Sequence, residues 1–167
     1  MVLVDYQIQS LCEAGMVKPY HKQMINPCSL DIRVGHSIMV ETEKGWEKID
    51  ISDRTLENPV MLKPQEFILV VSLEIFNIPN NICGEFALKS STARDGYDHA
   101  SSSWIDAGWK NSVLTMEIRN NRRFKSLPIY PYLRIGQIVF FPCNPPVHNY
   151  YQTGKYNHDL SVQSNKS

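Results

Sequence analysis

A short polar segment places two adjacent hydroxyls between two cations. Residues 89–96 read Lys-Ser-Ser-Thr-Ala-Arg-Asp-Gly and directly follow residues 85–88, which we predict to be a strand. Hydroxyls, backbone amides and a guanidinium all donate hydrogen bonds to an anion, so the segment is suited to binding phosphate. On local chemistry alone, such a run is more often a turn whose hydroxyls cap a helix, and both interpretations stay open at this point.

The second candidate is one carboxylate, Glu117, on a predicted strand. Leu114, Met116 and Ile118 recur at every second position between residues 113 and 120, which is the period of a strand with one buried face. Glu117 must then point to the opposite face, towards water or towards a site. A segment rich in tryptophan precedes it, and a carboxylate that tryptophan partly shields from water is suited to act as a general base. The alternative is an ordinary solvated strand face.

The cysteines and histidines do not form a recognisable metal or nucleophile motif. Zinc enzymes that deaminate a pyrimidine ring typically carry His-x-Glu and Pro-Cys-x-x-Cys, and neither pattern is present in the sequence. The four cysteines, at positions 12, 28, 83 and 143, are too widely spaced for a zinc knuckle or a secreted disulfide scaffold. We therefore expect no zinc and a reducing, cytoplasmic location.

Length and charge restrict the class of protein. A chain of 167 residues with 43% apolar and 20% charged residues is long enough for one well-buried core and too short for two ordinary domains. The 17 basic residues balance the 17 acidic ones, so no global positive field exists to bind a nucleic-acid polymer. The sequence shows neither the pattern of a signal peptide nor an apolar run of membrane-spanning length, and we expect no membrane association.

The hydrophobic periodicity predicts a short helix followed by many strands. Apolar residues between positions 4 and 12 recur at helical spacing. From Ser29 onward the period changes to two, and prolines interrupt the apolar runs at loop-like intervals. We predict an all-β sandwich or barrel over residues 1–143. Residues 144–167 are polar and aperiodic, and we predict a flexible tail there.

Four segments resemble, in order, the motifs of dCTP deaminases and dUTPases. Residues 27–35, Pro-Cys-Ser-Leu-Asp-Ile-Arg-Val-Gly, are similar to the first motif of that superfamily, and residues 62–79 to its next strand pair. Residues 89–96 resemble its phosphate-binding motif, Arg/Lys-Ser-Ser-x-x-Arg-x-Gly, and residues 135–140 its late Ile-Gly-Gln strand. The resemblance spans residues 5–142, and four ordered motifs are much more specific than any one of them.

A further segment favours the deaminase branch of that superfamily. Where dUTPases typically read Ile-Asp-x-Asp-Tyr-x-Gly, residues 104–109 read Trp-Ile-Asp-Ala-Gly-Trp, which resembles the deaminase form and especially the bifunctional deaminase-dUTPases of archaeal type. Deaminases of this kind also carry a glutamate in a strand that ends in Asn, and residues 116–120, Met-Glu-Ile-Arg-Asn, resemble that strand.

The resemblance implies a fold and a mechanism. The fold would be a dUTPase-like distorted β-barrel, jelly-roll-like, with a short N-terminal helix, assembled as a C3 homotrimer whose active sites are built from neighbouring subunits. Glu117 would activate water for attack on C4 of cytosine and pass the proton to the departing ammonia. Ser90 would orient that water, and Arg94 would link the catalytic and phosphate regions.

The resemblance also implies how the nucleotide is held. Asp106 would bind the deoxyribose 3′-hydroxyl, and Lys155 with Tyr156 resembles the Lys-Tyr of a tail that closes over the phosphates. Magnesium would bind through the triphosphate rather than through protein side chains, as its preference for phosphate oxygens suggests. The predicted nucleotide-binding residues are Lys89, Ser91, Asp106, Trp109, Gln137, Lys155 and Tyr156.

Three features differ from the family pattern, and one of them is that the span from Arg94 to Asp106 is about one residue shorter than the pattern predicts. The distance from Asp106 to Glu117 is one residue longer than the pattern predicts, and Asn111 stands in place of a turn glycine. Because asparagine tolerates a positive φ better than most residues, we place the extra residue in the turn at 110–112, where it leaves the strand alternation intact. Asp159 stands where a phosphate-contacting glutamine is common.

Three functions are compatible with these residues. The first is metal-independent hydrolytic deamination of a deoxycytidine nucleotide, most simply dCTP to dUTP plus ammonia. The second is a bifunctional dCTP deaminase/dUTPase that gives dUMP and pyrophosphate, since Asp106 is available to both steps. The third is a catalytically idle member of the same fold that binds a nucleotide or a partner protein. The presence of Ser90, Arg94 and Glu117 together favours an enzyme.

Overall fold

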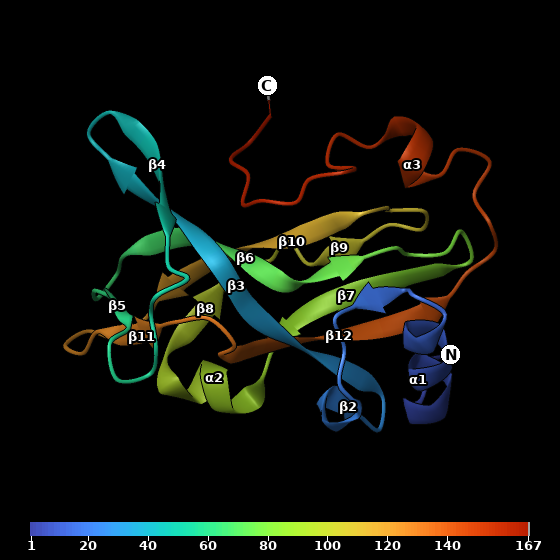
Figure 1. Cartoon of the computed structure of the whole chain (residues 1–167), viewed down its shortest axis with the longest axis horizontal. Coiled ribbons are helices and arrows are strands. Elements are labelled where there is room, and N and C mark those ends of the chain that lie inside the picture. The colour runs from blue at the N-terminus through green and yellow to red at the C-terminus, as the bar shows by residue number, and fades with distance from the viewer. Residues whose placement is uncertain (167) are drawn as a thin grey trace.

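Antiparallel strands build most of the molecule (Figure 1). The computed structural model describes residues 1–166. Ten strands form one curled sheet whose central order is β8-β10-β6-β3-β12-β7-β9, and β5 pairs with β11 separately. The strands are β1 (Val17–Lys18), β2 (Ile25–Asn26), β3 (Ser29–Thr42), β4 (Gly45–Asp50), β5 (Val60–Leu62), β6 (Phe67–Phe76), β7 (Ile82–Leu88), β8 (Tyr97–His99), β9 (Trp104–Ile105), β10 (Ser112–Asn120), β11 (Leu127–Ile129) and β12 (Arg134–Pro142).

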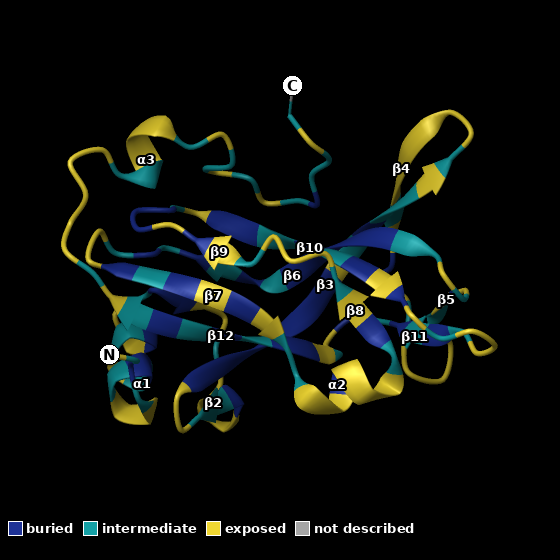
Figure 2. Cartoon of the chain, turned by 180° about the vertical axis from the view of Figure 1, so that it is seen from behind, coloured by how far each residue is buried: buried dark blue, intermediate teal, exposed yellow. Residues whose placement is uncertain are grey.

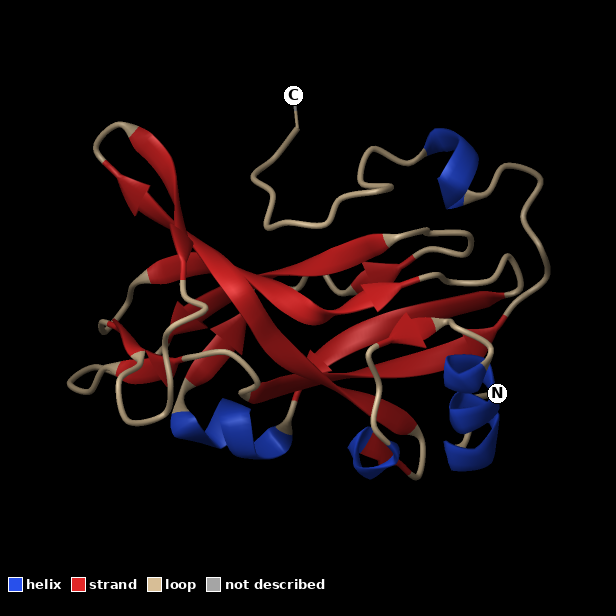
Figure 3. Ribbon diagram, viewed as in Figure 1, coloured by secondary structure: helices blue, strands red, loops and turns tan. Residues whose placement is uncertain are grey.

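The helices are short and lie around the sheet (Figure 3). They are α1 (Asp5–Glu13), the 3₁₀ turn η1 (Lys22–Met24), α2 (Ser90–Asp95) and α3 (Tyr150–Thr153). α1 is the helix predicted near the start, and its apolar side packs into the core through Ile8 and Cys12. The predicted all-β fold with a short N-terminal helix is therefore confirmed. No helix within residues 1–166 is long and apolar enough to cross a membrane.

The long strand β3 passes through the middle of the core. Its residues 29–35 are all buried, because neighbouring elements cover both faces, whereas its second half pairs with β4 in an exposed hairpin (Figure 2). Aliphatic side chains fill the core, and burying each contributes about 1.5–3 kcal/mol to folding. Those without exposed surface include Ile32, Val34, Ile38, Val70, Met116 and Ile118.

The C-terminal segment folds back over β10 (Figure 1). Val162 is 3% exposed and packs against Leu69 and Val113. The backbone N of Val113 also donates a hydrogen bond to the carbonyl of Asp159, at 2.8 Å. The chain's own residues 144–166 thus cover part of this face of the sheet. Whether the segment moves stays a prediction.

One buried ion pair marks an irregularity in β6. The Glu74 carboxylate is buried and accepts hydrogen bonds from Nε of Arg33, at 2.7 Å, and from the backbone N of Arg33, at 3.0 Å. The pairing of β6 with β10 shifts register between Val71 and Ile75, the stretch that contains this residue. Burial raises the pKa of the Glu74 carboxyl, and the hydrogen bonds and charge of Arg33 oppose that shift. Arg33 and Glu74 therefore depend on each other for a counter-charge.

Replacing Glu74 with alanine should destabilise the fold by about 3–5 kcal/mol, because Arg33 would keep a buried charge without a partner. Urea unfolding followed by circular dichroism measures this difference. Glu47→Ala, a change on the exposed strand β4, is the control and should alter the free energy of unfolding by no more than about 0.5 kcal/mol. Equal stabilities of the two variants would show that the ion pair contributes nothing.

Candidate functional site

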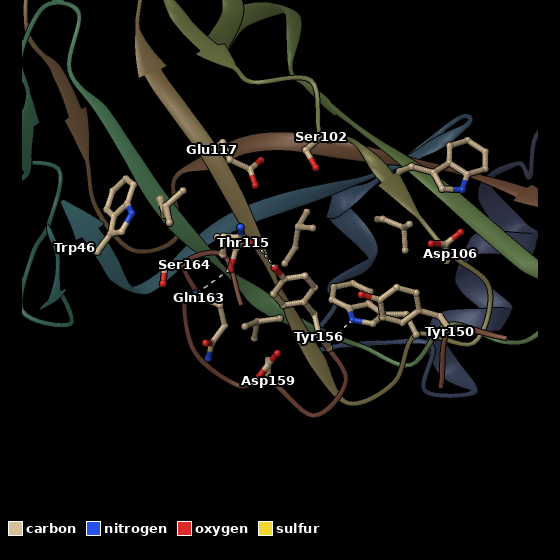
Figure 4. Close-up of a pocket in the computed structure, with 17 residues that line it drawn as sticks. Trp46, Ser102, Asp106, Thr115, Glu117, Tyr150, Tyr156, Asp159, Gln163 and Ser164 are labelled. Carbon is tan, nitrogen blue, oxygen red and sulfur yellow. Dashed lines mark hydrogen bonds between the residues drawn. The ribbon is translucent and has the colours of Figure 1, made fainter. Parts of the chain in front are cut away.

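A cavity of about 450 Å³ lies between β10 and the C-terminal segment (Figure 4). Residues of β10, of β9 and the loop after it, of the β3–β4 hairpin and of the C-terminal segment line it. Its size and mixed lining are typical of a site for a small molecule. The aromatic lining residues are Trp46, Trp104, Trp109, Tyr150 and Tyr156, and the polar ones include Ser102, Asp106, Thr115, Glu117, Asp159 and Gln163.

Glu117 lines this cavity from β10 (Figure 4). Its neighbours in the strand, Met116 and Ile118, have no exposed surface, so the strand alternation directs Glu117 to the opposite face. The side chain is 26% exposed, which leaves the carboxylate accessible to a ligand and partly shielded from water. Asn111, in the turn before the strand, has a φ of 45°, the positive value predicted for it.

His99 contacts the Glu117 carboxylate from β8, which pairs with β10. The His99 Nε2 and Glu117 Oε2 atoms are 3.1 Å apart, and the imidazole ring packs on Phe86 at a centroid distance of 4.8 Å. The contact is close but is not aligned as a hydrogen bond, because within residues 1–166 the buried Oε2 has no hydrogen-bond partner. His99 was not predicted from the sequence, because no spacing links it to Glu117.

Asp106 lies at the edge of the same cavity, directly after β9. The residue is exposed, and it also lines a second cavity of about 430 Å³ together with Cys83 and Cys143. Its carboxylate is therefore accessible to a ligand that occupies the space beside Glu117. The structure brings together the two carboxylates that the sequence singled out.

Trp109 joins the cavity wall to the C-terminal segment. Its indole is 7% exposed and stacks on Phe76 at a centroid distance of 5.3 Å. Its Nε1 donates a hydrogen bond to the carbonyl of Tyr156, at 2.8 Å. The stacking on Phe76 and the hydrogen bond to Tyr156 thus fix the position of the Trp109 indole, which lines the cavity.

The C-terminal segment brings an ion pair to the cavity. The Lys166 ammonium lies 2.6 Å from the Asp159 carboxylate and 5.3 Å from the ring centroid of Tyr156. Lys166 thereby provides a counter-charge for Asp159, an acidic side chain that would otherwise repel a nearby phosphate. Tyr156 lines the cavity, whereas Lys155 is exposed and its Nζ donates a hydrogen bond to the Lys166 carbonyl, at 3.3 Å.

The predicted phosphate motif lies elsewhere in the molecule. Ser90, Ser91 and Arg94 are exposed on α2, and α2 and the C-terminal segment lie at opposite sides of the strands (Figures 1 and 2). Among residues 1–166, none of these three side chains lines the cavity that contains Glu117. The predicted site residues therefore lie in two separate places of one chain, and whether both belong to one site stays a prediction. We call them the cavity half-site, around Glu117, and the α2 half-site, formed by the exposed residues of α2.

Lys89 and Gln137, also predicted to bind the nucleotide, contact other side chains near the start of α2. Lys89 Nζ donates a hydrogen bond to the Asp31 carboxylate, at 2.5 Å, and the Lys89 side chain is 25% exposed. Arg134 Nη1 lies 3.8 Å from the same buried carboxylate. The Gln137 side chain accepts a hydrogen bond from Ser29 Oγ, at 2.8 Å. These contacts connect β3, β12 and the residue that precedes α2.

The carboxylates that line the cavity are Asp106, Glu117 and Asp159. Within residues 1–166, no group of three or more His, Cys, Asp or Glu side chains is arranged to hold a metal ion. The exposed Asp106 carboxylate is the acidic group that a cation carried on a ligand's phosphate oxygens could meet.

The sequence matches a family model described as dCTP deaminase-like over residues 2–143. A relative from Methanosphaerula palustris, named dCTP deaminase, dUMP-forming, is 33% identical over 169 residues, which cover 93% of this chain and 90% of the relative. A relative of the same name from Thermobifida fusca is 31% identical over 166 residues, which cover 90% of this chain and 83% of the relative.

Solved structures confirm a dUTPase-like fold. The dCTP deaminase of Agrobacterium tumefaciens aligns with a TM-score of 0.69 at 20% identity over 83% of this chain and 48% of that one, so this chain spans about half the length of that protein. A dUTPase from phage phi11 of S. aureus, described with a structural Mg(II) ion, aligns with a TM-score of 0.53 at 16% identity over 79% of this chain and 88% of that one.

The family model covers both the α2 half-site and the cavity residues of β9 and β10, and relatives above 30% identity extend along most of the chain. The chain belongs to the dCTP deaminase-like family.

Proposed function

We propose that this protein is a bifunctional dCTP deaminase that converts dCTP and two water molecules into dUMP, ammonia and pyrophosphate. The observation that carries the proposal is that Glu117 and Asp106, one carboxylate for each hydrolytic step, line the same cavity. The relatives named dCTP deaminase, dUMP-forming, support dUMP as the product over dUTP, which is the simplest expectation from the sequence.

Glu117 would act in the deamination step. Its carboxylate would accept a proton from the water that attacks C4 of cytosine, and the proton would pass to the amino group that leaves as ammonia. A positioned general base contributes about 10²–10⁴-fold to a rate. The contact with His99 at 3.1 Å restricts where the carboxylate can lie, and the shielded position of Glu117 in the cavity excludes part of the bulk water.

Asp106 would act in the release of pyrophosphate. Its carboxylate is exposed and lines the cavity, so it would be available to the deoxyribose 3′-hydroxyl and to the water that attacks the α-phosphorus. Magnesium bound through the phosphate oxygens would neutralise the negative charge that develops on them. The protein's part in this step would be to hold the sugar and, through Asp106, to orient the attacking water and accept a proton from it.

We propose that a second copy of the chain completes each site in a homotrimer. A nucleotide whose cytosine lies beside Glu117 needs hydrogen-bond donors for its phosphates. The exposed α2 half-site offers Ser90, Ser91 and Arg94, but it lies away from the cavity half-site of its own chain. Donors from a neighbouring α2 would meet this need, and Lys155 with Tyr156 would cover the phosphates as the tail closes.

Incubation of the purified protein with dCTP and Mg²⁺ should release ammonia and pyrophosphate in equal amounts, with dUMP as the nucleotide product. Coupled assays for the two small products and chromatography of the nucleotides measure this. Asp106→Asn should lower dUMP formation about 10²-fold or more, because the amide cannot accept a proton from water. Asp53→Asn, in an exposed loop, is the control. Ammonia without pyrophosphate would identify a deaminase that makes dUTP only.

Glu117→Gln should lower the deamination rate by about 10²–10⁴-fold while dCTP still binds, because the amide keeps the size of the side chain and removes the base. Turnover assays and calorimetric titration with dCTP separate the two effects. Glu57→Gln, in an exposed loop, should leave both unchanged. Unchanged turnover in Glu117→Gln would remove Glu117 from the mechanism.

Co-expression of Glu117→Gln subunits with Arg94→Ala subunits should restore activity that neither variant has alone. If each site takes Glu117 from one subunit and Arg94 from another, random assembly leaves about one quarter of the sites with both residues intact. The specific activity of the purified mixed trimers tests this. Separately purified variants, mixed without subunit exchange, are the control. Mixed trimers as inactive as the single variants would place the whole site within one chain.

A further inference from the structure

Helix α2 carries the proposed phosphate-binding side chains but is poorly anchored by itself. Ser90, Ser91 and Arg94 point to solvent, and among the six residues of α2 in the described chain Thr92 is the buried one. A helix of this length is not stable in isolation, so its position depends on the buried Thr92, whose hydroxyl donates to the Arg134 carbonyl at 3.4 Å, and on contacts at its two ends. At its start, the backbone N of Lys89 donates to a β12 carbonyl, at 3.2 Å.

The segment that follows β10 holds the other end of α2. Arg122 Nη1 donates a hydrogen bond to the carbonyl of Asp95, the last residue of the helix, at 3.1 Å. The backbone N of Asn121 donates to the carbonyl of Gly96, at 2.8 Å. The last carbonyls of a helix lack partners within the helix, and a cationic donor there is favourable for both hydrogen bonding and charge.

Gly96 makes room for the aliphatic part of Arg122. Its φ is 105°, in the left-handed region that ends α2, so glycine is favoured there by the backbone alone. A Cβ at position 96 would also lie 2.8 Å from Cδ of Arg122 and would overlap its Cγ. The last glycine of the phosphate motif therefore has a second role in this chain, which is to let the Arg122 side chain lie against the end of the helix.

The segment itself is fixed by a buried amide at the end of β10. Asn120 has no exposed surface, and its Oδ1 accepts a hydrogen bond from the backbone N of Arg122, at 2.8 Å. Its Nδ2 donates to the carbonyls of Leu62 and Lys125, each at 2.9 Å. The backbone of Arg122 is therefore hydrogen-bonded to Asn120, the last residue of β10, and Asn120 lies three residues beyond Glu117 in that strand.

We propose that Arg122 is a positioning residue for the α2 half-site. It holds the C-terminal end of α2 so that Ser90 and Arg94 keep the orientation that a triphosphate requires. The proposal rests on the proposed function, because it assumes that α2 binds the phosphates of dCTP. Arg122 acts through the backbone of α2 and does not itself contact the nucleotide.

Arg122→Gln should raise KM for dCTP roughly tenfold, the scale of one hydrogen bond from a charged donor, and change kcat less than about twofold. Inhibition by deoxycytidine, which lacks phosphates, should be unchanged. Arg122→Lys should recover part of the loss, since an ammonium can also donate to the Asp95 carbonyl. The matched control is Arg123→Gln, which removes the same charge from the exposed neighbour whose guanidinium lies over the Phe124 ring, and KM should stay unchanged there.

Hydrogen exchange of residues 89–97 tests the structural part separately from activity. Exchange in this segment should be faster in Arg122→Gln than in the wild type and in Arg123→Gln. Failure of the wild type to turn over dCTP would refute the proposed function, whereas the exchange result would still decide whether Arg122 holds α2. Equal KM values and equal exchange rates in the two glutamine variants would overturn the positioning role.

Discussion

Met116 and Ile118 anchor β10 in the core, and Glu117 between them can point only to the opposite face. Because side chains alternate with a period of two, a slip of one residue in this strand would bury the carboxylate and expose two apolar side chains. Such a slip would cost both the burial energy of the two aliphatic groups and the desolvation of a charge. The positive φ of Asn111 accommodates the longer turn before the strand and leaves this alternation undisturbed.

The elements next to β10 provide the side chains that surround Glu117. β8 brings the imidazole of His99 to within 3.1 Å of the carboxylate, and the loop after β9 brings Asp106 to the same cavity. The C-terminal segment forms the cavity wall opposite β10. Val162 packs on the sheet, and the backbone carbonyl of Tyr156 accepts a hydrogen bond from the Trp109 indole. A carboxylate on a strand face, which would otherwise be an ordinary solvated side chain, thus lines a cavity with five aromatic residues in its walls.

The proposed function gives the two half-sites different chemical tasks. The cavity half-site offers aromatic walls and carboxylates, which suit a base and a sugar, whereas the α2 half-site offers hydroxyls and a guanidinium, which suit phosphates. In one chain α2 and the C-terminal segment lie at opposite sides of the strands, and the proposal that a second copy completes each site is based on this separation. The contact of Arg122 with the end of α2 connects the strand that carries Glu117 to the helix that carries Arg94.

Much of the fold and part of the site were predictable from the sequence because they depend on local patterns. Period-two alternation predicts the strands and the face of Glu117, helical spacing predicts α1, and the tolerance of asparagine for positive φ predicts the turn at Asn111. The motif at residues 89–96 and the segment at 104–109 indicate the family, which the comparisons confirm.

Other features of the candidate site depend on which strands become neighbours, and the local spacing of residues does not predict strand neighbours. His99 meets Glu117 because β8 pairs with β10, and Arg122 meets α2 because β10 ends beside it. The placement of Ser90 and Arg94 away from Glu117 within one chain likewise follows from the order of the strands. The sequence by itself determined the longer strands, the short N-terminal helix and the outward direction of Glu117. Only the tertiary structure decided which side chains surround that carboxylate, because contacts between distant residues arise from packing.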